Sequence, residues 1–280
     1  MYRLTLTRAV AGTAFLLFTL AQGCSTQPAG PKIPTLAEIP EIYPGILAGY
    51  LPQDQLPDSL SILPPPPLPD SPAYEYDIAR NHQLTSDVDP ARWALAAADA
   101  DLHFPVAAAA FDCALGAKVT PDTTPNLYVM MRRTLADAAL ATYTAKNAYQ
   151  RQRPFMANDG PICTPQERDM LSNDGSYPSG HTAYGWAWAL ILAEVVPERG
   201  NVILARGLQF GESRAVCNVH WPSDVAAGRT MGAAAVARMH DDPVFRAQLA
   251  AAKAEWQALD KAEAAKSLEC NGMDPVTATP

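Results

Sequence analysis

The pattern of apolar and polar residues changes character near Pro90. Beyond it, apolar residues recur at the spacing of amphipathic helices, in alanine-rich segments separated by proline and glycine clusters. Alternating runs of β-branched residues are scarce, so the pattern predicts an all-α domain. The helices are expected at Ala91–Leu102, Val106–Leu115, Asn126–Tyr149, His181–Val196, Glu198–Phe210, Ser223–Arg238 and Pro243–Leu268.

The segment Pro28–Pro72 precedes these helices and contains 13 of the 26 prolines. Proline lacks a backbone N–H and restricts the backbone, so this stretch predicts extended, polyproline-like chain rather than a regular helix. The residues alone leave two interpretations open, a disordered linker or an arm packed over the domain. Packing is favoured by the apolar residues Ile42, Tyr43, Ile46, Leu47 and Leu60.

The N-terminus has the layout of an export signal. Arg3 and Arg8 precede the apolar run Ala9–Leu20, which is too short to span a bilayer comfortably, and small residues follow it. We therefore expect a mature protein that begins at Cys24 and is periplasmic or secreted. A lipid on Cys24, as in an outer-membrane lipoprotein, stays open, because such proteins usually carry Leu where this chain has Ala21. The chain then divides into a signal peptide at 1–23, a Pro-rich arm at 24–72, a helical domain at 73–268 and a tail at 269–280.

Composition narrows the class of function. The 280 residues are 48% hydrophobic and 18% charged, enough for one large globular domain, with a formal net charge of −8. Non-specific nucleic-acid binding depends on neutralising phosphates, so an acidic chain is not expected to bind nucleic acid. A few focused cations can still bind a small anion.

Four cysteines follow Cys24, and in an oxidising compartment they predict up to two disulfides. Their spacing contains no close pair, so a zinc site is not expected. Of the three connectivities, we expect Cys113–Cys217 and Cys163–Cys270.

Three clusters carry the candidate chemistry. They are Lys146 followed after six residues by Arg153-Pro154, then Pro178-Ser179-Gly180-His181, and then Ser213-Arg214 followed by His220 and Asp224. Each cluster alone arises easily by chance. Together, in this order and with these internal spacings, they are a specific signal.

The first two clusters and Arg214 suit an anion such as phosphate. Arg153 and Arg214 offer planar forks that match phosphate oxygens, and Lys146 offers a point charge. Ser179 and Gly180 stand at the start of a helix, where free backbone N–H groups and the helix dipole favour an anion.

The two histidines suit covalent catalysis. Asp224 follows His220 by four residues, in the first turn of a helix that Pro222 can begin, so its carboxylate can fix one ring nitrogen and leave the other free to attack phosphorus. His181 then supplies the proton for the leaving oxygen.

Other polar residues are expected to be structural. Asp99, Asp101 and His103 suggest metal ligands, yet within a helix they do not share one face. His82 is expected in a loop, and Glu212 to brace an arginine.

The three clusters resemble the type 2 phosphatidic acid phosphatase superfamily, which includes bacterial class A non-specific acid phosphatases and vanadium haloperoxidases. The resemblance covers roughly Tyr50–Met239, and the stretches Leu56–Pro67 and Gly211–Asp224 are similar to class A acid phosphatases in particular. It implies a single helical-bundle domain of that type with an extended Pro-rich N-terminal arm that belongs to the domain. It also implies a set of roles: nucleophile His220, proton donor His181, orienting residue Asp224, and phosphate ligands Lys146, Arg153, Ser179, Gly180 and Arg214.

The expected function is therefore an acid phosphatase that needs no metal and no other cofactor and hydrolyses small-molecule phosphomonoesters at mildly acidic pH. The alternatives are a lipid phosphate or pyrophosphate phosphatase, a vanadium-dependent haloperoxidase, and a non-catalytic phosphate-binding lipoprotein. A membrane partner is expected only through a lipid on Cys24, and a homo-oligomer stays open.

Overall fold

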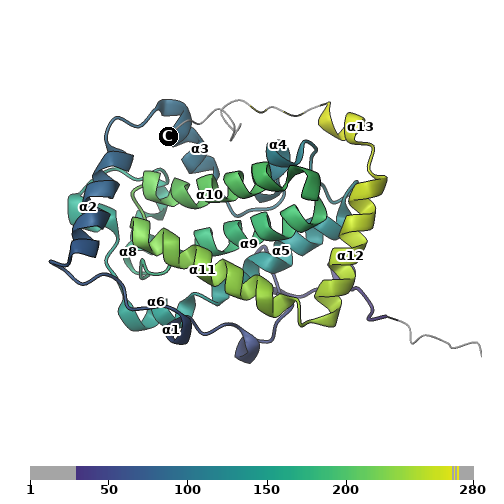
Figure 1. Ribbon diagram of the computed structural model, residues 1–280, viewed down its shortest axis with the longest axis horizontal. Helices are drawn as coiled ribbons and strands as arrows, with labels where there is room; N and C mark the ends of the chain where they lie inside the picture. Colours follow the sequence, from purple (N-terminus) through teal and green to yellow (C-terminus); the bar gives the residue numbers. More distant parts are fainter. Residues whose placement is uncertain (1–29, 267, 269, 271–280) are drawn as a thin grey trace, which may run out of the picture. The chain divides into compact units, whose positions relative to one another are not determined.

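A buried helix, α9 (Gly180–Val195), lies at the centre of the computed structural model, which describes residues 30–266, 268 and 270. It packs most extensively against α10 (Gly200–Val216), α11 (Pro222–Met239) and α5 (Pro125–Leu140), and α12 (Pro243–Ala258) packs on α5. Figure 1 shows α9, α10 and α11 running side by side, with α12 across their end. Apolar residues occur all round α9, as expected for a helix that is covered on every side.

Shorter elements surround these helices. The remaining α-helices are α1 (Ser59–Ile62), α2 (Pro72–Thr85), α3 (Pro90–Ala98), α4 (Asp112–Leu115), α6 (Tyr143–Tyr149), α7 (Pro154–Asn158), α8 (Arg168–Ser172) and α13 (Lys261–Ala265). Short 3-10 helices lie at Leu36–Glu38, Gln53–Gln55, Val106–Phe111, Pro165–Glu167 and Pro197–Arg199. The described strands are β1 (Glu41–Tyr43) and β2 (Ile46–Leu47), which form one antiparallel hairpin. The prediction of an all-α fold is confirmed, with this hairpin as the exception.

Several expected helix boundaries were wrong. The expected helix Asn126–Tyr149 is two helices, α5 and α6. At their junction the Ala139 carbonyl accepts both the Thr142 N–H (3.1 Å) and the Thr142 hydroxyl (2.6 Å), a tighter turn than that of an α-helix. The expected helix Pro243–Leu268 ends at Ala258, because the Asp260 side chain caps a new helix, α13. Helix α2 was missed, so His82 lies in a helix and not in a loop.

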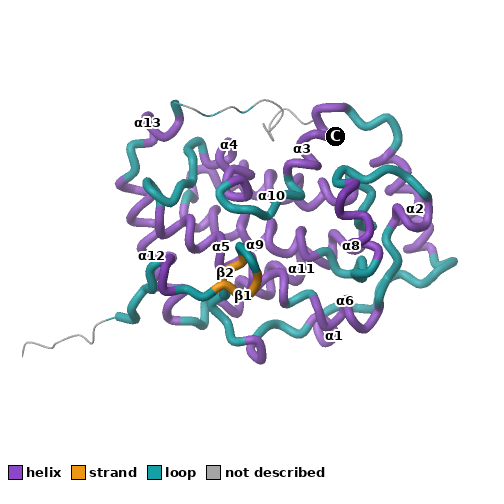
Figure 2. The backbone as a smooth tube through the Cα atoms, turned by 180° about the vertical axis from the view of Figure 1, so that it is seen from behind, coloured by secondary structure: helices purple, strands orange, loops and turns teal. Residues whose placement is uncertain are grey.

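The Pro-rich arm is packed onto the helices. Leu47, Tyr50 and Leu63 are buried, and Figure 2 shows the β1–β2 hairpin lying over α5. The Asp137 carboxylate of α5 accepts the backbone N–H of Tyr50 (2.8 Å) and that of Leu51 (3.1 Å), which fixes the arm to the bundle. The packing hypothesis is right for Leu47, whereas the expected contacts Ile42, Tyr43 and Leu60 are exposed.

The expected disulfide pairing was wrong. The bridges are Cys113–Cys270 and Cys163–Cys217, with Cα–Cα distances of 5.7 and 4.9 Å. Cys217 ends α10, where Ile162, Val216 and Val219 gather in one apolar cluster that brings the Cys163 loop alongside. Each cysteine can serve one bridge, so this packing leaves Cys113 to pair with Cys270 near the C-terminus.

The predicted signal at 1–23 and Cys24 lie outside the described residues. Within the part of the chain that is described, no helix combines the length and the apolarity that crossing a membrane requires.

Candidate active site

A cavity of about 320 Å³ lies at the N-terminal end of α9. Its polar lining brings together four residues that the sequence predicted from separate clusters, Lys146, Arg153, His181 and His220, and adds Asp174. Its apolar lining comes from Leu102, Ala139, Tyr143, Met170, Leu171 and Tyr184. The cavity therefore has one charged side and one apolar side.

Helix α9 begins beside this cavity. The Ser179 side chain caps it by accepting the Thr182 N–H (3.3 Å), and the Ser179 N–H donates to the Asp224 carbonyl of α11 (3.0 Å). Gly180 lines the cavity, and a Cβ on it would stand 4.0 Å from Lys146 Cε. The glycine thus leaves open the space between the helix terminus and the lysine, where an anion is favoured.

Two buried cations share one carboxylate at the charged side. Lys146, on α6, and Arg153, the residue before α7, are 3% and 1% exposed. The Asp174 carboxylate lies 3.0 Å from Lys146 Nζ and 2.8 Å from Arg153 Nη2, and 34% of its side chain is exposed. Sequence reasoning missed Asp174, because it belongs to none of the three clusters.

Arg214 is the third buried cation, and it is different. It lies in the last turn of α10 with 0% exposure, and none of its three guanidinium nitrogens has a hydrogen-bond partner among the described residues. An unpaired buried charge is expensive, so this guanidinium requires an anion.

The ring of His220 has a hydrogen-bond partner on each side. On one side Arg153 Nη1 lies 3.1 Å from Nε2, and on the other Ser176 Oγ lies 3.3 Å from Nδ1. The Asp224 carboxylate is 3.6 Å from Nδ1, so the expected direct hydrogen bond is not formed. The Asp224 carboxylate instead accepts hydrogen bonds from Ser176 and from Arg151, which lies in the loop between α6 and α7. Sequence reasoning missed both residues.

Arg151 connects this network to α2. Its guanidinium pairs with Asp224 (2.5 Å) and with Asp77 of α2 (2.8 Å), and Ser223 also binds Asp77. Arg151 stands two residues before Arg153, and this proximity could have identified it as a candidate site residue. Nothing near Asp77 in the sequence indicated a role in the site, because helix α2 had not been predicted.

His181 occupies the first turn of α9. Its Nε2 lies 3.2 Å from the Ala100 carbonyl, which only accepts, so Nε2 donates and Nδ1 is left for another partner. Tyr184 stands one turn further along, with ring centroids 5.1 Å apart, and its buried hydroxyl has no partner among the described residues.

The electrostatics favour neutral histidines and an incoming anion. Burial, followed by the charge of Arg214, holds the pKa of His181 well below 6.5. Burial, followed by the charges of Arg153 and Lys146, does the same to the pKa of His220. Burial, followed by the charge of Arg153, lowers the pKa of Lys146 to about 8. A bound phosphoryl group would reverse these effects, since its negative charge stabilises every cation around it.

The remaining candidates are structural. Asp99 pairs with the buried Arg206 of α10, and Glu212 braces Arg80 at 3.3 Å, as expected. Over the described residues, no group of three or more His, Cys, Asp or Glu side chains is arranged to hold a metal ion.

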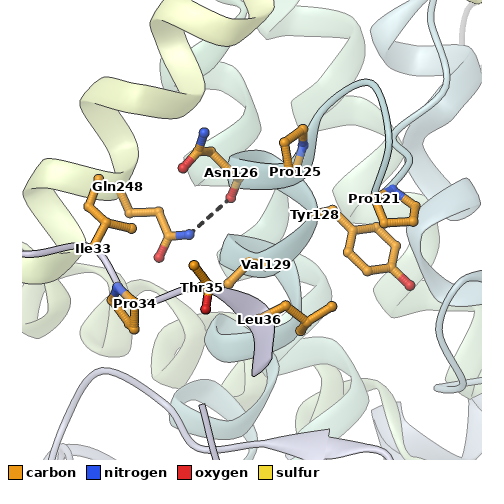
Figure 3. Close-up of a pocket in the computed structure, with 10 residues that line it drawn as sticks. All are labelled: Ile33, Pro34, Thr35, Leu36, Pro121, Pro125, Asn126, Tyr128, Val129 and Gln248. Atoms are coloured by element: carbon orange, nitrogen blue, oxygen red, sulfur yellow. Dashed lines mark hydrogen bonds between the residues drawn. The ribbon is translucent and has the colours of Figure 1, made fainter. Parts of the chain in front are cut away.

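A second cavity, of about 300 Å³, lies between the arm and the start of α5 (Figure 3). Arm residues such as Ile33 and Leu36 face Tyr128 and Val129 across it, and the Gln248 amide donates to the Asn126 carbonyl (3.4 Å). No histidine, cysteine, lysine, arginine or carboxylate lines it, so the charged cavity at α9 is the better candidate for chemistry.

Comparison with known proteins agrees with this geometry. Residues 127–246 match the PAP2 superfamily domain. The chain is 41% identical over 223 residues to a non-specific acid phosphatase of Providencia stuartii, a match that covers 79% of this chain and 88% of that protein. It is 42% identical over 194 residues to a non-specific acid phosphatase of Salmonella typhimurium, covering 69% and 78%. It is also 41% identical over 200 residues to an acid phosphatase of Zymomonas mobilis, covering 71% and 76%.

Proposed function

The chain belongs to the PAP2 superfamily, among its non-specific acid phosphatases, and from this we propose that it hydrolyses phosphomonoesters through a phosphohistidine at His220. The observation that carries the proposal is the unpartnered guanidinium of Arg214, buried beside both histidines. A phosphoryl group supplies the anion that Arg214 lacks.

Phosphate binding uses the charged side of the cavity. Lys146 and Arg153 line the cavity, and the charge of the buried Arg214 acts on both histidines. The free N–H groups of α9 begin at Gly180, because the Ser179 N–H donates to the Asp224 carbonyl. These groups neutralise the transferring phosphoryl group in a site from which most water is excluded.

The first step forms a bond between His220 Nε2 and phosphorus. Arg153 can only donate, so Nε2 carries no proton, and its lone pair becomes free for attack when Arg153 turns its N–H to the phosphoryl oxygens. The ester oxygen leaves with the electron pair of the P–O bond, and His181 Nδ1 gives it a proton. His181 gains that proton when substrate binds, because the phosphoryl charge raises its lowered pKa.

The second step reverses these roles. Water attacks phosphorus and passes a proton to His181, while the N–P bond breaks and its electron pair returns to His220 Nε2. The products are an alcohol and inorganic phosphate. The apolar side of the cavity, with Tyr143 and Met170 at its exposed rim, contacts the leaving alcohol.

One experiment tests the function and the intermediate together. The purified protein is given nucleotides, sugar phosphates, an aryl phosphate and a lipid phosphate, with and without EDTA. We expect hydrolysis of the soluble monoesters in both conditions, and an alkaline quench should leave a phosphoryl mass on the peptide that contains His220. His220→Ala should lose both signals. Activity that vanishes with EDTA and returns with a divalent ion contradicts the metal-free reaction, and vanadate-dependent bromide oxidation would favour a haloperoxidase.

We also propose that the protein works in the periplasm or outside the cell. Two observations support this, the signal-like residues 1–23 and the two disulfides, which persist in oxidising compartments. Mass spectrometry of protein from its native cell should find a chain that begins at Cys24. A diacylglyceryl mass on Cys24 would make it a lipoprotein, and an intact Met1 would contradict export.

A further inference from the structure

The nucleophile and its orienting acid do not touch. His220 Nδ1 is 3.6 Å from the nearer Asp224 oxygen, beyond hydrogen-bond range. The Ser176 hydroxyl lies between them, 3.3 Å from Nδ1 and 2.5 Å from Asp224 Oδ2. Ser176 has 0% exposure, so water cannot easily take its place.

The direction of each hydrogen bond follows from what each group can do. A carboxylate only accepts, so the Ser176 hydroxyl donates to Asp224 and keeps its lone pairs for Nδ1. Arg153 only donates, so Nε2 accepts and, in the neutral ring, the proton must be on Nδ1. The chain of donors therefore runs from His220 Nδ1 through Ser176 Oγ to Asp224.

Ser176 and Asp224 are both held in place by further hydrogen bonds. The Ser176 N–H donates to the Arg151 carbonyl (2.8 Å). Asp224 Oδ2 also accepts the Trp221 N–H (2.8 Å), and its Oδ1 accepts from Arg151. The carboxylate is thus occupied by fixed donors at both oxygens, so moving closer to His220 would break contacts already made.

We propose that Ser176 is a positioning residue, which holds His220 as the Nδ1–H tautomer by relaying the hydrogen bond to Asp224. The role of this residue in catalysis rests on the proposed function. Without the hydroxyl, the ring keeps only the Ser176 backbone on this side and loses its connection to Asp224. The tautomer with its proton on Nε2 cannot attack phosphorus.

Charged groups face His220 from several elements. Lys146 of α6, Arg153 beside α7 and Arg214 of α10 all disfavour the protonated ring, and Asp224 of α11 is the acid on the opposite side. The Ser176 backbone also faces the ring and opposes these cations. Ser176→Ala keeps that backbone, so it isolates the hydroxyl.

The test compares Ser176→Ala, Ser176→Thr and the control Ser172→Ala, which removes a hydroxyl from the exposed surface of α8. We expect Ser176→Ala to lower kcat about tenfold to a hundredfold with little change in KM, the usual effect of one lost buried hydrogen bond. Ser176→Thr should restore most of the rate, and Ser172→Ala should match the parent. Single-turnover experiments should place the loss in the phosphorylation step.

Nitrogen-15 NMR of the histidines gives a readout that does not need activity. In the parent protein the proton of the neutral His220 ring should be on Nδ1, and in Ser176→Ala it should shift toward Nε2. The Ser176→Ala variant should still unfold near the melting temperature of the parent. Parental kcat and tautomer in Ser176→Ala would overturn the proposal, as would a Thr variant that is folded yet not rescued. A parent with the Nδ1–H tautomer but without phosphatase activity would refute the proposed function alone.

Discussion

Within the described part of the chain, the buried Arg214 has no hydrogen-bond partner, whereas Arg206, eight residues earlier on the same helix, pairs with Asp99. Both side chains are at most 1% exposed. The contrast separates a charge kept for a ligand from a charge kept for the fold. The sequence did not show this difference. It placed Arg214 in a motif, but it could not say whether another residue pairs with its side chain.

The two arginines should therefore respond in opposite ways. Arg214→Met removes an unpaired charge and should stabilise the phosphate-free protein by about 1–4 kcal/mol, which corresponds to a melting point raised by roughly 2–4 °C per kcal/mol. It should also abolish the further rise that phosphate causes in the parent. Arg206→Met strands Asp99 and should destabilise by about 3–5 kcal/mol. Thermal melts with and without phosphate measure both, and a large destabilisation by Arg214→Met would contradict the assignment.

Lys146 predicts the alkaline limit of phosphate binding. Its pKa is lowered to about 8, so above that pH the free protein loses the ammonium charge. Phosphate binds better to the ammonium form of Lys146 than to the neutral amine. The inhibition constant of inorganic phosphate should therefore rise toward about tenfold per pH unit above pH 8. Lys146→Arg keeps its charge and should flatten this rise. An inhibition constant that stays level to pH 9.5 in the parent would count against the role of Lys146.

Among elements, the contact between α9 and α11 decides the geometry of the site. α9 carries the cap Ser179, α11 carries Asp224, and a backbone hydrogen bond joins the two residues. Glycines on α11 permit the approach: a Cβ on Gly228 would stand 2.5 Å from the Ser179 carbonyl oxygen, and one on Gly232 would stand 2.2 Å from the Ala183 carbonyl oxygen. No side chain fits at such distances.

Gly228→Ala should therefore push the two helices apart. We expect a loss of about 1–3 kcal/mol, typical of an overpacked core, together with a lower kcat because Asp224 moves relative to α9. Gly200→Ala, at the start of α10, is the matched control, since its Cβ would meet nothing closer than 4.0 Å. Denaturant melts and steady-state rates test the pair. Equal behaviour of the two variants would show that the close approach is not required.

At the scale of the whole molecule, the two disulfides close very different parts of the chain. Cys163–Cys217 spans 54 residues and ends three residues before His220, whereas Cys113–Cys270 spans 157 residues and joins α4 to the region after α13. The loop that the shorter bridge closes contains α9 and α10, and with them the site residues Ser179, Gly180, His181 and Arg214. The longer bridge is not part of the cavity lining.

Replacing the shorter bridge should affect stability and function together. In the chain-entropy account, Cys163→Ala with Cys217→Ala costs about 4 kcal/mol. It should also lower activity at 25 °C, because the loop that carries Val219 and His220 loses its anchor. Cys113→Ala with Cys270→Ala should lower the melting temperature but keep the activity of the parent at 25 °C. Melting curves and rates measured on both double variants test this prediction. A greater loss of activity without the longer bridge than without the shorter one would refute it.

The sequence by itself determined the helical class and the candidate site residues that meet in the cavity. Both are local properties: helix periodicity repeats every three to four residues, and motif chemistry resides in residue types at short spacing. Pro222 at the first position of α11 and Ser179 at the cap of α9 were readable for the same reason.

Only the tertiary structure decided what lies between those residues. Ser176 reaches His220 across 44 residues and Asp224 across 48. Arg151 reaches Asp77 across 74 residues, and Cys113 pairs with Cys270 across 157. Such contacts depend on how helices pack, and many packings satisfy one local pattern. The unpartnered state of Arg214 is of the same kind, because the absence of a partner is a property of everything folded around the side chain and of no segment alone.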